Sequence, residues 1–359
     1  MTKPRSAAST VPFIDHYCQA YRPVFEDVRL FEHFKGLHLG LIACPKAKTL
    51  SNLSEYLGLK NSQGLHHFLR DSAWDVALLR NIRLWLTKLW IGDRAVTLII
   101  NEVGIPKKGH STDYATRQYF NNLQKIENGL ITLQVYAVVQ GITYALGFEI
   151  FKPQSRLKDR DRYQRKCQLA HQLLFHLQEL GIRINLILAD DLSDEENQFQ
   201  NHLDSFNVTY LLAKRSPQQI DPITKSAKRK EKWQLYEQKL SRYSAEMRYI
   251  RVLNSLSNSK NFLYQISKQA IDTPFLNKSW YLETNQTGDI TNLINRISPL
   301  GEIQNWLEYG AYQILCEIGW EDFRLTHYAS IEKWWEIILS VHLFMSFQAN
   351  YHGLETFIS

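Results

Sequence analysis

The chain has 359 residues, of which 44% are hydrophobic, and a formal net charge of +6 at pH 7. This apolar content predicts a folded, soluble protein with a large core, arranged as one elaborated domain or a few smaller ones, and it excludes a largely disordered chain. The basic excess, with a pI near 8.9, fits a polyanionic partner but is also common among unrelated proteins.

The cysteines and the apolar segments indicate the cellular compartment that we expect for the protein. Cys18, Cys44, Cys167 and Cys316 are too scattered for a zinc knuckle or a compact disulfide framework, so we expect reduced thiols in a cytoplasmic protein. No apolar stretch near the N-terminus is long enough for a signal peptide. The most apolar segment, 337–347, is shorter than the roughly 20 residues that span a bilayer, so we expect no membrane insertion.

Residues 11 to about 90 have helical apolar spacing. Within them, 49–59 and 62–69 are typical of a helix, a turn and a second helix. One interpretation places the second helix on DNA, with His66, His67 and Arg70 near phosphates or bases. The other is an ordinary helical hairpin, which the residues alone favour.

From residue 96 the pattern changes to strands. A mixed sheet flanked by helices is predicted by strands at 96–101, 130–139, 143–150, 184–190 and 208–213, with a helix at 162–180. A lysine-rich stretch at 225–232 follows, then β-like runs at 247–253 and 261–266. Its cations, including Lys228, Arg229 and Lys230, fit either contacts along a DNA backbone or a solvated loop.

Five ordered motifs carry a resemblance. They are Asn-Glu-Val-Gly-Ile-Pro-Lys-Lys-Gly at 101–109, Thr-Asp-Tyr-Ala-Thr-Arg-Gln-Tyr at 112–119, Leu-Gln-Lys-Ile-Glu-Asn-Gly at 123–129, Leu-Ile-Leu-Ala-Asp at 186–190 and Asn-Trp-Leu-Glu-Tyr-Gly at 305–310. Together they resemble the DDE-type insertion-sequence transposases, specifically the insertion sequence seven-oh-one group of the insertion-sequence-four superfamily. The resemblance covers most of the chain.

This resemblance implies a ribonuclease-H-like α/β catalytic domain with an all-helical N-terminal domain. It divides the chain into a helical, DNA-binding domain at 1–92, the first part of the core at 93–213, a β-rich insertion at 214–285 and a helical completion of the core at 286–359. It also implies that the partners are DNA, in particular transposon ends, and a second copy in a homodimer.

Catalysis of this type needs two Mg²⁺ ions held by carboxylates, since hard oxygen ligands suit this ion. The resemblance assigns Asp190 as the second acid and Glu308 as the third. The first acid is replaced by Asn101, which offers a neutral oxygen and no negative charge. Glu102 is an imperfect substitute ligand because adjacent strand residues point to opposite faces. If active at all, the enzyme would bind Mg²⁺ through Asp190, Glu308 and a weakened contribution from Asn101 or Glu102.

Further departures surround the third acid. Relatives place a tyrosine, an arginine and a lysine where this chain has Gly301, Gln304 and Leu315, and glutamine cannot reproduce a bidentate arginine–phosphate contact. Lys107, Lys108 and Arg117 remain available for phosphate contacts, although a solvated loop is an equally good interpretation.

The sequence therefore predicts a transposase homologue that binds DNA and whose catalysis is impaired or absent. The alternative is a non-enzymatic DNA-binding protein derived from a transposase, either an inhibitor or a relic. Trp334 and Trp335 occupy a helical setting, so we expect them to pack in a core rather than to stack on bases.

Overall fold

The computed structural model describes residues 5–123, 125–190, 192, 198–214, 229–230, 232–239, 244–254, 261–270, 279–286, 288–297 and 311–358. The helices are α1 (Pro12–Cys18), η1 (Gln19–Val24), α2 (Val28–Ala43), α3 (Leu50–Tyr56), α4 (Gln63–Arg70), α5 (Val76–Ile91), η2 (Gln154–Arg156), α6 (Lys166–Glu179), α7 (Gln198–Asp204), α9 (Thr291–Arg296), η5 (Gln313–Glu317) and α10 (Tyr328–Ile358). The strands are β1 (Val96–Pro106), β2 (Thr116–Phe120), β3 (Lys125–Val139), β4 (Ile142–Phe151), β5 (Ile184–Asp190), β6 (Thr209–Lys214), β7 (Arg229–Lys230), β8 (Gln234–Lys239), β9 (Ala245–Asn254), β10 (Phe262–Ser267) and β11 (Ser279–Thr284).

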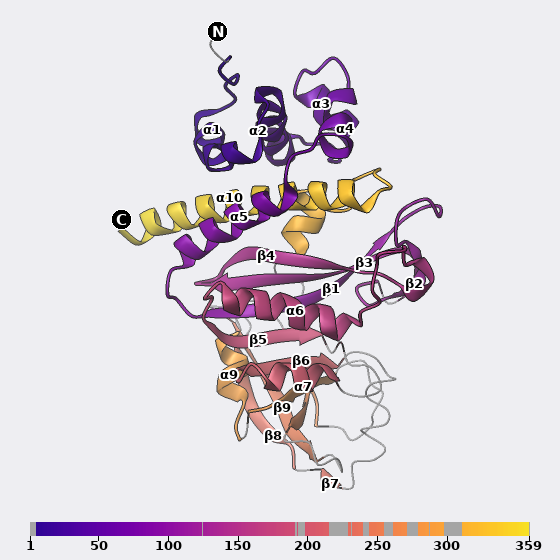
Figure 1. Ribbon diagram of the computed structural model, residues 1–359. Coiled ribbons are helices and arrows are strands. Elements are labelled where there is room, and N and C mark those ends of the chain that lie inside the picture. The colour runs from indigo at the N-terminus through magenta and orange to yellow at the C-terminus, as the bar shows by residue number, and fades with distance from the viewer. Residues whose placement is uncertain are drawn as a thin grey trace.

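The centre of the molecule is a mixed sheet in the order β4-β3-β1-β5-β6 (Figure 1). β1 pairs antiparallel with β3 and parallel with β5, and β5 pairs parallel with β6. The central strands are almost continuous apolar runs because both of their faces are covered. Three antiparallel strands followed by two parallel ones form the ribonuclease-H-like arrangement, so the expected fold class is confirmed.

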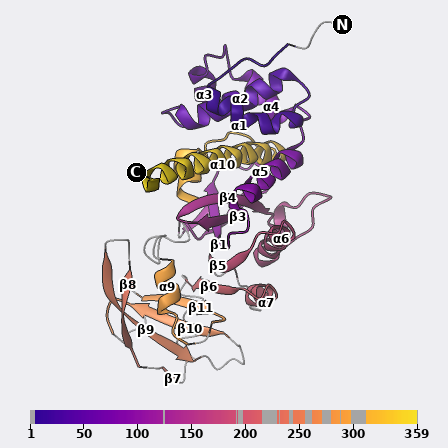
Figure 2. The same cartoon turned by 90° about the vertical axis from the view of Figure 1, so that its left-hand side faces the viewer.

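Helices cover both faces of this sheet (Figures 1 and 2). One face packs against α6 and α7, through side chains such as Leu98 and Ile100 of β1. The other face packs against η5, α10 and the N-terminal helices, through side chains such as Ile99 and Val103. Residues of β1 therefore alternate between two separate hydrophobic cores, and this alternation decides which way each candidate site residue points.

The strands of the predicted β-rich insertion continue the central sheet. β11 pairs antiparallel with β6, and β10, β9 and β7 follow in order, so that the described strands form one sheet. β8 pairs with β9 outside this path. The insertion strands are thus joined to the catalytic core by backbone hydrogen bonds.

The helical N-terminal region is confirmed. Its last helix, α5, is held against α10 and β4 by a buried ion pair and by hydrogen bonds. Arg83 on α5 and Glu336 on α10 are both fully buried, and Arg83 Nε donates to Glu336 Oε2 at 3.1 Å. Arg83 also donates to the carbonyl oxygens of Ala145 and Leu146 on β4. One guanidinium therefore joins two helices to the sheet.

β1 and β3 extend further than the sequence predicts, and β2, β7, β8 and β11 were not predicted. β1 continues to Pro106, and β3 begins at Lys125, where it pairs with the unpredicted β2. The Phe120 ring lies over Gly104 and Gly129, where any added methyl group would overlap it or a backbone carbonyl. The two glycines thus allow the β2–β3 ribbon to pack onto the end of β1.

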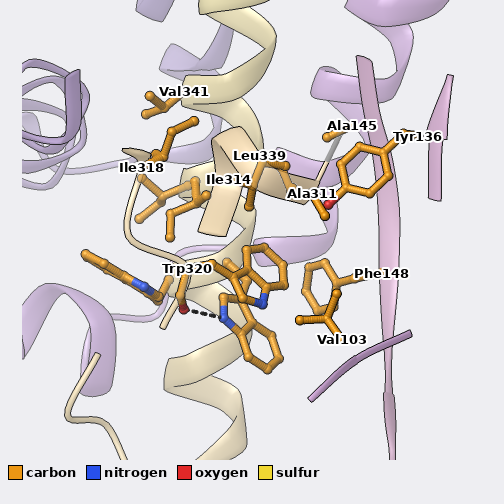
Figure 3. Close-up of a cluster of buried hydrophobic side chains, with 14 of the residues drawn as sticks. Val103, Tyr136, Ala145, Phe148, Ala311, Ile314, Ile318, Trp320, Leu339 and Val341 are labelled. Carbon is orange, nitrogen blue, oxygen red and sulfur yellow. Dashed lines mark hydrogen bonds between the residues drawn. The ribbon is translucent and has the colours of Figure 1, made fainter. Parts of the chain in front are cut away.

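The tryptophans pack as expected. Trp334 and Trp335 are buried, and Trp335 stacks on Trp320 with ring centroids 4.7 Å apart. Trp335 Nε1 donates to the Trp320 carbonyl oxygen, the dashed line of Figure 3. Figure 3 also shows Phe148 of the sheet beside this stack. No helix in the described ranges combines the length and the hydropathy of a bilayer-spanning segment.

Candidate active site

Asn101 and Asp190 lie side by side on adjacent parallel strands. The last paired residues of β1 and β5 are Ile100 and Ala189, so the next residue on each strand is Asn101 and Asp190 respectively. Neighbouring strands are about 4.8 Å apart, which brings the two side chains within reach of one ligand. Both are buried, with 4% and 5% of their surface exposed. The structure therefore brings together the first two predicted site residues.

The two side chains point away from α6. Asn101 alternates with Ile100 and lies on the same side of β1 as Ile99 and Val103, which pack in the core beneath α10. The next strand outward, β3, places Gln134 opposite Asn101 in register. Gln134, Asn101 and Asp190 thus form a row of polar side chains across three neighbouring strands.

Gln134 was not among the predicted site residues. It is buried, and its Oε1 accepts a hydrogen bond from the Tyr136 hydroxyl, while its Nε2 has no hydrogen-bond partner among the residues that the structure describes. A polar residue within the apolar run 130–139 was the signal that could have identified it. Figure 3 shows Tyr136 directed toward Ala311, the first described residue after the segment that carries Glu308.

Glu102 points to the opposite face of the sheet. It lies beyond Ile100 on the side that packs against α6, where its Oε2 is 2.8 Å from Lys166 Nζ. Its side chain is 1% exposed, and no described residue forms a hydrogen bond with its Oε1. This carboxylate therefore cannot join Asp190 without a change of register, as the strand alternation predicts. No local pattern indicates its partner Lys166, because that residue is distant along the chain.

The third acid and its surroundings fall partly outside the described residues. Glu308, Gly301 and Gln304 lie there. Leu315, in η5, is partly buried against the core beneath α10. The side chain at this position therefore makes an apolar contact and supplies no positive charge.

The described part of the site does not fit a pair of divalent cations. Within the residues described, no group of three or more His, Cys, Asp and Glu side chains could hold a metal ion. Along the row formed by Gln134, Asn101 and Asp190, Asp190 supplies the carboxylate and the other two supply amides. A two-cation clamp at a phosphodiester needs more anionic oxygen than this row provides.

The comparisons with known proteins identify the family of the chain. The family model described as DDE superfamily endonuclease matches residues 23–246, which include both Asn101 and Asp190. The chain belongs to the DDE superfamily of endonucleases. Members of this superfamily generally use divalent metal ions. A probable transposase for insertion sequence element IS701 from Microchaete diplosiphon is 41% identical over 333 residues, 92% of this chain and 87% of that protein. The chain is thus an IS701-type transposase homologue.

A solved structure was also found. The Drosophila P element transposase strand transfer complex matches at 12% identity with a TM-score of 0.24, covering 58% of this chain and 38% of that chain. A similarity at this level adds nothing to the assignment.

The three cations that were predicted to contact phosphates, Lys107, Lys108 and Arg117, lie in different environments. Lys107 Nζ donates to the carbonyl oxygens of Glu321 and Phe323 at 3.1 and 3.2 Å, and lies 3.4 Å from the Phe323 ring centroid. Burial lowers the pKa of the Lys107 ammonium to about 8. Lys108 and Arg117 are exposed. Lys107 therefore fastens the end of β1 to the 321–323 segment, and Lys108 and Arg117 remain candidates for DNA contact.

The helical hairpin places its polar residues outward. On α4, His66, His67 and Arg70 are exposed, whereas Leu65 and Phe68 are buried. Arg70 pairs with Asp71 at 2.9 Å, which reduces its positive potential. This arrangement is compatible with both interpretations of the hairpin.

The lysine-rich stretch at 225–232 lies only partly within the described residues. Lys228 lies outside the described residues. Arg229 and Lys230 form β7, paired with Asn254 and Leu253 of β9 at the far edge of the sheet. Their backbone is a strand rather than a loop.

Proposed function

We propose that this transposase homologue binds DNA, in particular transposon ends, and that its strand-cleaving chemistry is impaired. The observation that carries the proposal is the amide of Asn101 beside Asp190, where the superfamily's chemistry needs a second carboxylate. An amide can donate one neutral oxygen to a cation but contributes no negative charge. Affinity for a pair of Mg²⁺ ions should therefore fall steeply.

Among the described residues, none near Asn101 substitutes for the missing charge. Glu102 is held on the opposite face by Lys166, and the third row member, Gln134, is a second amide. Together with Glu308, the acids that the resemblance assigns to this site number two, Asp190 and Glu308. Two carboxylates suffice for a weakly held cation but not for the clamp that stabilises both attacking and leaving oxygens.

Support for DNA binding comes from exposed cations. Lys108 and Arg117 are exposed beyond the end of the central sheet, and α4 presents His66, His67 and Arg70 on the helical domain. Each phosphate that such a residue neutralises releases counterions, so affinity should fall as salt rises.

The test uses the purified full chain with a short DNA duplex of fixed sequence. We expect salt-dependent binding and no nicking with either Mg²⁺ or Mn²⁺. Replacing both Lys108 and Arg117 by alanine should reduce the slope of log affinity against log salt by about two, since each lost phosphate contact changes it by roughly 0.9. Nicking by the unaltered chain that Asp190→Ala abolishes would refute the proposed impairment. Absence of any DNA binding would refute the proposal as a whole.

Oligomeric state is a separate part of the proposal. We expect a homodimer on DNA because two transposon ends are joined in one complex during transposition. Light scattering with and without the duplex measures this directly, and a monomer under both conditions contradicts it.

A further inference from the structure

The β2–β3 ribbon presents an exposed apolar pair. Tyr119 on β2 and Ile126 on β3 are register partners, and they are 48% and 58% exposed. Paired residues of an antiparallel ladder point to the same side, so the two side chains form one apolar surface. Leu123, in the turn that joins the strands, is 38% exposed. Large apolar side chains gathered at the tip of a ribbon usually mark a contact surface.

The ribbon is fixed so that this pair cannot turn inward. Phe120, next to Tyr119, points to the other side and is fully buried over Gly104 and Gly129. Gln118 Nε2 on that side donates to the Gly129 carbonyl oxygen at 3.1 Å. Because neighbouring strand residues point to opposite sides, burial of Phe120 commits Tyr119 to solvent.

Cations flank the apolar pair. Arg117, two residues from Tyr119 on the same side of β2, is the register partner of Asn128. Asn128 Nδ2 donates to the carbonyl oxygens of Lys107 and Gly109, at 2.7 and 2.8 Å, which holds the exposed Lys108 close to this part of the ribbon.

The acidic side chain of the ribbon is neutralised. Glu127 pairs with Lys125 at 2.9 Å and alternates with Ile126, so it belongs to the opposite side of β3. The surface around Tyr119 and Ile126 therefore combines apolar side chains with net positive charge.

The pair also lies on the candidate site's side of β3. Gln134 and Ile126 are eight positions apart (134 − 126), and the even spacing puts both on one side of the strand. Eight residues at roughly 3.4 Å each make about 27 Å of strand. Leu130 and Thr132, which lie between them on that side, are fully buried, so the exposed pair stands beyond the covered part of the sheet.

We propose that Tyr119 and Ile126 form a wedge that inserts between stacked base pairs of DNA bound at the tip of the β2–β3 ribbon. The proposal rests on the proposed DNA binding. The positive charge around the pair favours a polyanion over an apolar protein surface. Insertion of apolar side chains between base steps unstacks the bases, and contacts between the flanking cations and the phosphates offset that cost.

The experiment compares two duplexes of the same length, one fully paired and one with a central mismatch, each carrying 2-aminopurine beside the centre. A mismatched step is already partly unstacked, so a wedge should bind it about tenfold more tightly and raise 2-aminopurine fluorescence further than with the paired duplex. Tyr119→Ala and Ile126→Ala should each lose most of that preference. The matched control is Phe175→Ala, since Phe175 is 51% exposed on α6, which covers the opposite face of the sheet.

The outcomes separate this inference from the proposed function. If the unaltered chain binds both duplexes equally without a fluorescence change, the wedge is refuted while DNA binding stands. If it binds neither duplex, the proposed function itself fails. If Tyr119→Ala changes the oligomeric state in light scattering but leaves the mismatch preference intact, the ribbon contacts a second copy instead, which also overturns the proposal.

Discussion

Restoring aspartate at position 101 should destabilise the folded chain in the absence of metal. Asn101→Asp would place a second carboxylate beside Asp190 on an adjacent parallel strand, at a site where both residues are almost fully buried. Two unit charges about 5 Å apart repel by about 3 kcal/mol at an effective dielectric constant of roughly 20. We therefore expect the free energy of unfolding to fall by about 3 kcal/mol at neutral pH.

Two measurements separate this repulsion from a general packing defect. First, urea denaturation should show the loss shrinking in mildly acidic buffer, because protonation of one carboxyl removes the repulsion, and growing again as pH rises. Second, Mg²⁺ or Mn²⁺ should restore stability to Asn101→Asp but not to the unaltered chain, since a ligand that binds only the folded state stabilises it. Asn101→Leu is the control, and its stability should respond to neither pH nor metal in this way.

The same variant tests the proposed impairment. Calorimetric titration should show that Asn101→Asp binds Mg²⁺ with measurable heat whereas the unaltered chain does not. Strand transfer should remain low, because glutamine at 304 and leucine at 315 do not replace the phosphate-binding side chains of relatives. Equal, negligible heats for both proteins, together with unchanged stability, would refute the electrostatic reasoning.

Two further predictions concern the architecture that supports the site. Glu336→Gln should lower the free energy of unfolding by about 3–5 kcal/mol in urea denaturation, because it leaves buried guanidinium charge uncompensated, whereas Glu55→Gln, in an exposed ion pair, should change it by about 1 kcal/mol or less. If Glu336→Gln and Glu55→Gln lowered the free energy of unfolding equally, the role of burial would be contradicted. Gly104→Ala should cost about 1–3 kcal/mol because its methyl group would overlap Phe120, while Gly36→Ala, in a helix interior with more room, should be neutral or stabilising by the same measurement.

The sequence predicted the central strands well because they are buried on both faces. The run at 184–190 coincides with β5, and its carboxyl end places Asp190 where the site lies. Burial on both faces produces an uninterrupted apolar run, which is a strong local signal. The position of Asn101 beside Asp190 followed the same logic, since adjacent parallel strands end at the same edge.

The features that were missed depend on pairing between distant segments. β2 is a short strand of alternating exposure, and it exists because β3 extends far enough to pair with it. The contact of Glu102 with Lys166 and the pairing of β11 with β6 likewise join residues far apart in the chain. Local periodicity carries no information about such partners, so the ribbon and the continuity of the large sheet emerge from the structure alone.

The asparagine at position 101 bears on cation binding and not on the arrangement of the strands. The register of β1 with β3 and β5 is kept with asparagine at residue 101, because apolar side chains on both faces of these strands are buried in the two cores. Without metal, an amide there avoids the repulsion of about 3 kcal/mol that a second carboxylate would introduce. Under the proposed function, the asparagine that weakens cation binding therefore also favours the metal-free fold. Under the proposed function, DNA binding does not depend on the charge at residue 101, which is why binding and nicking have to be measured separately.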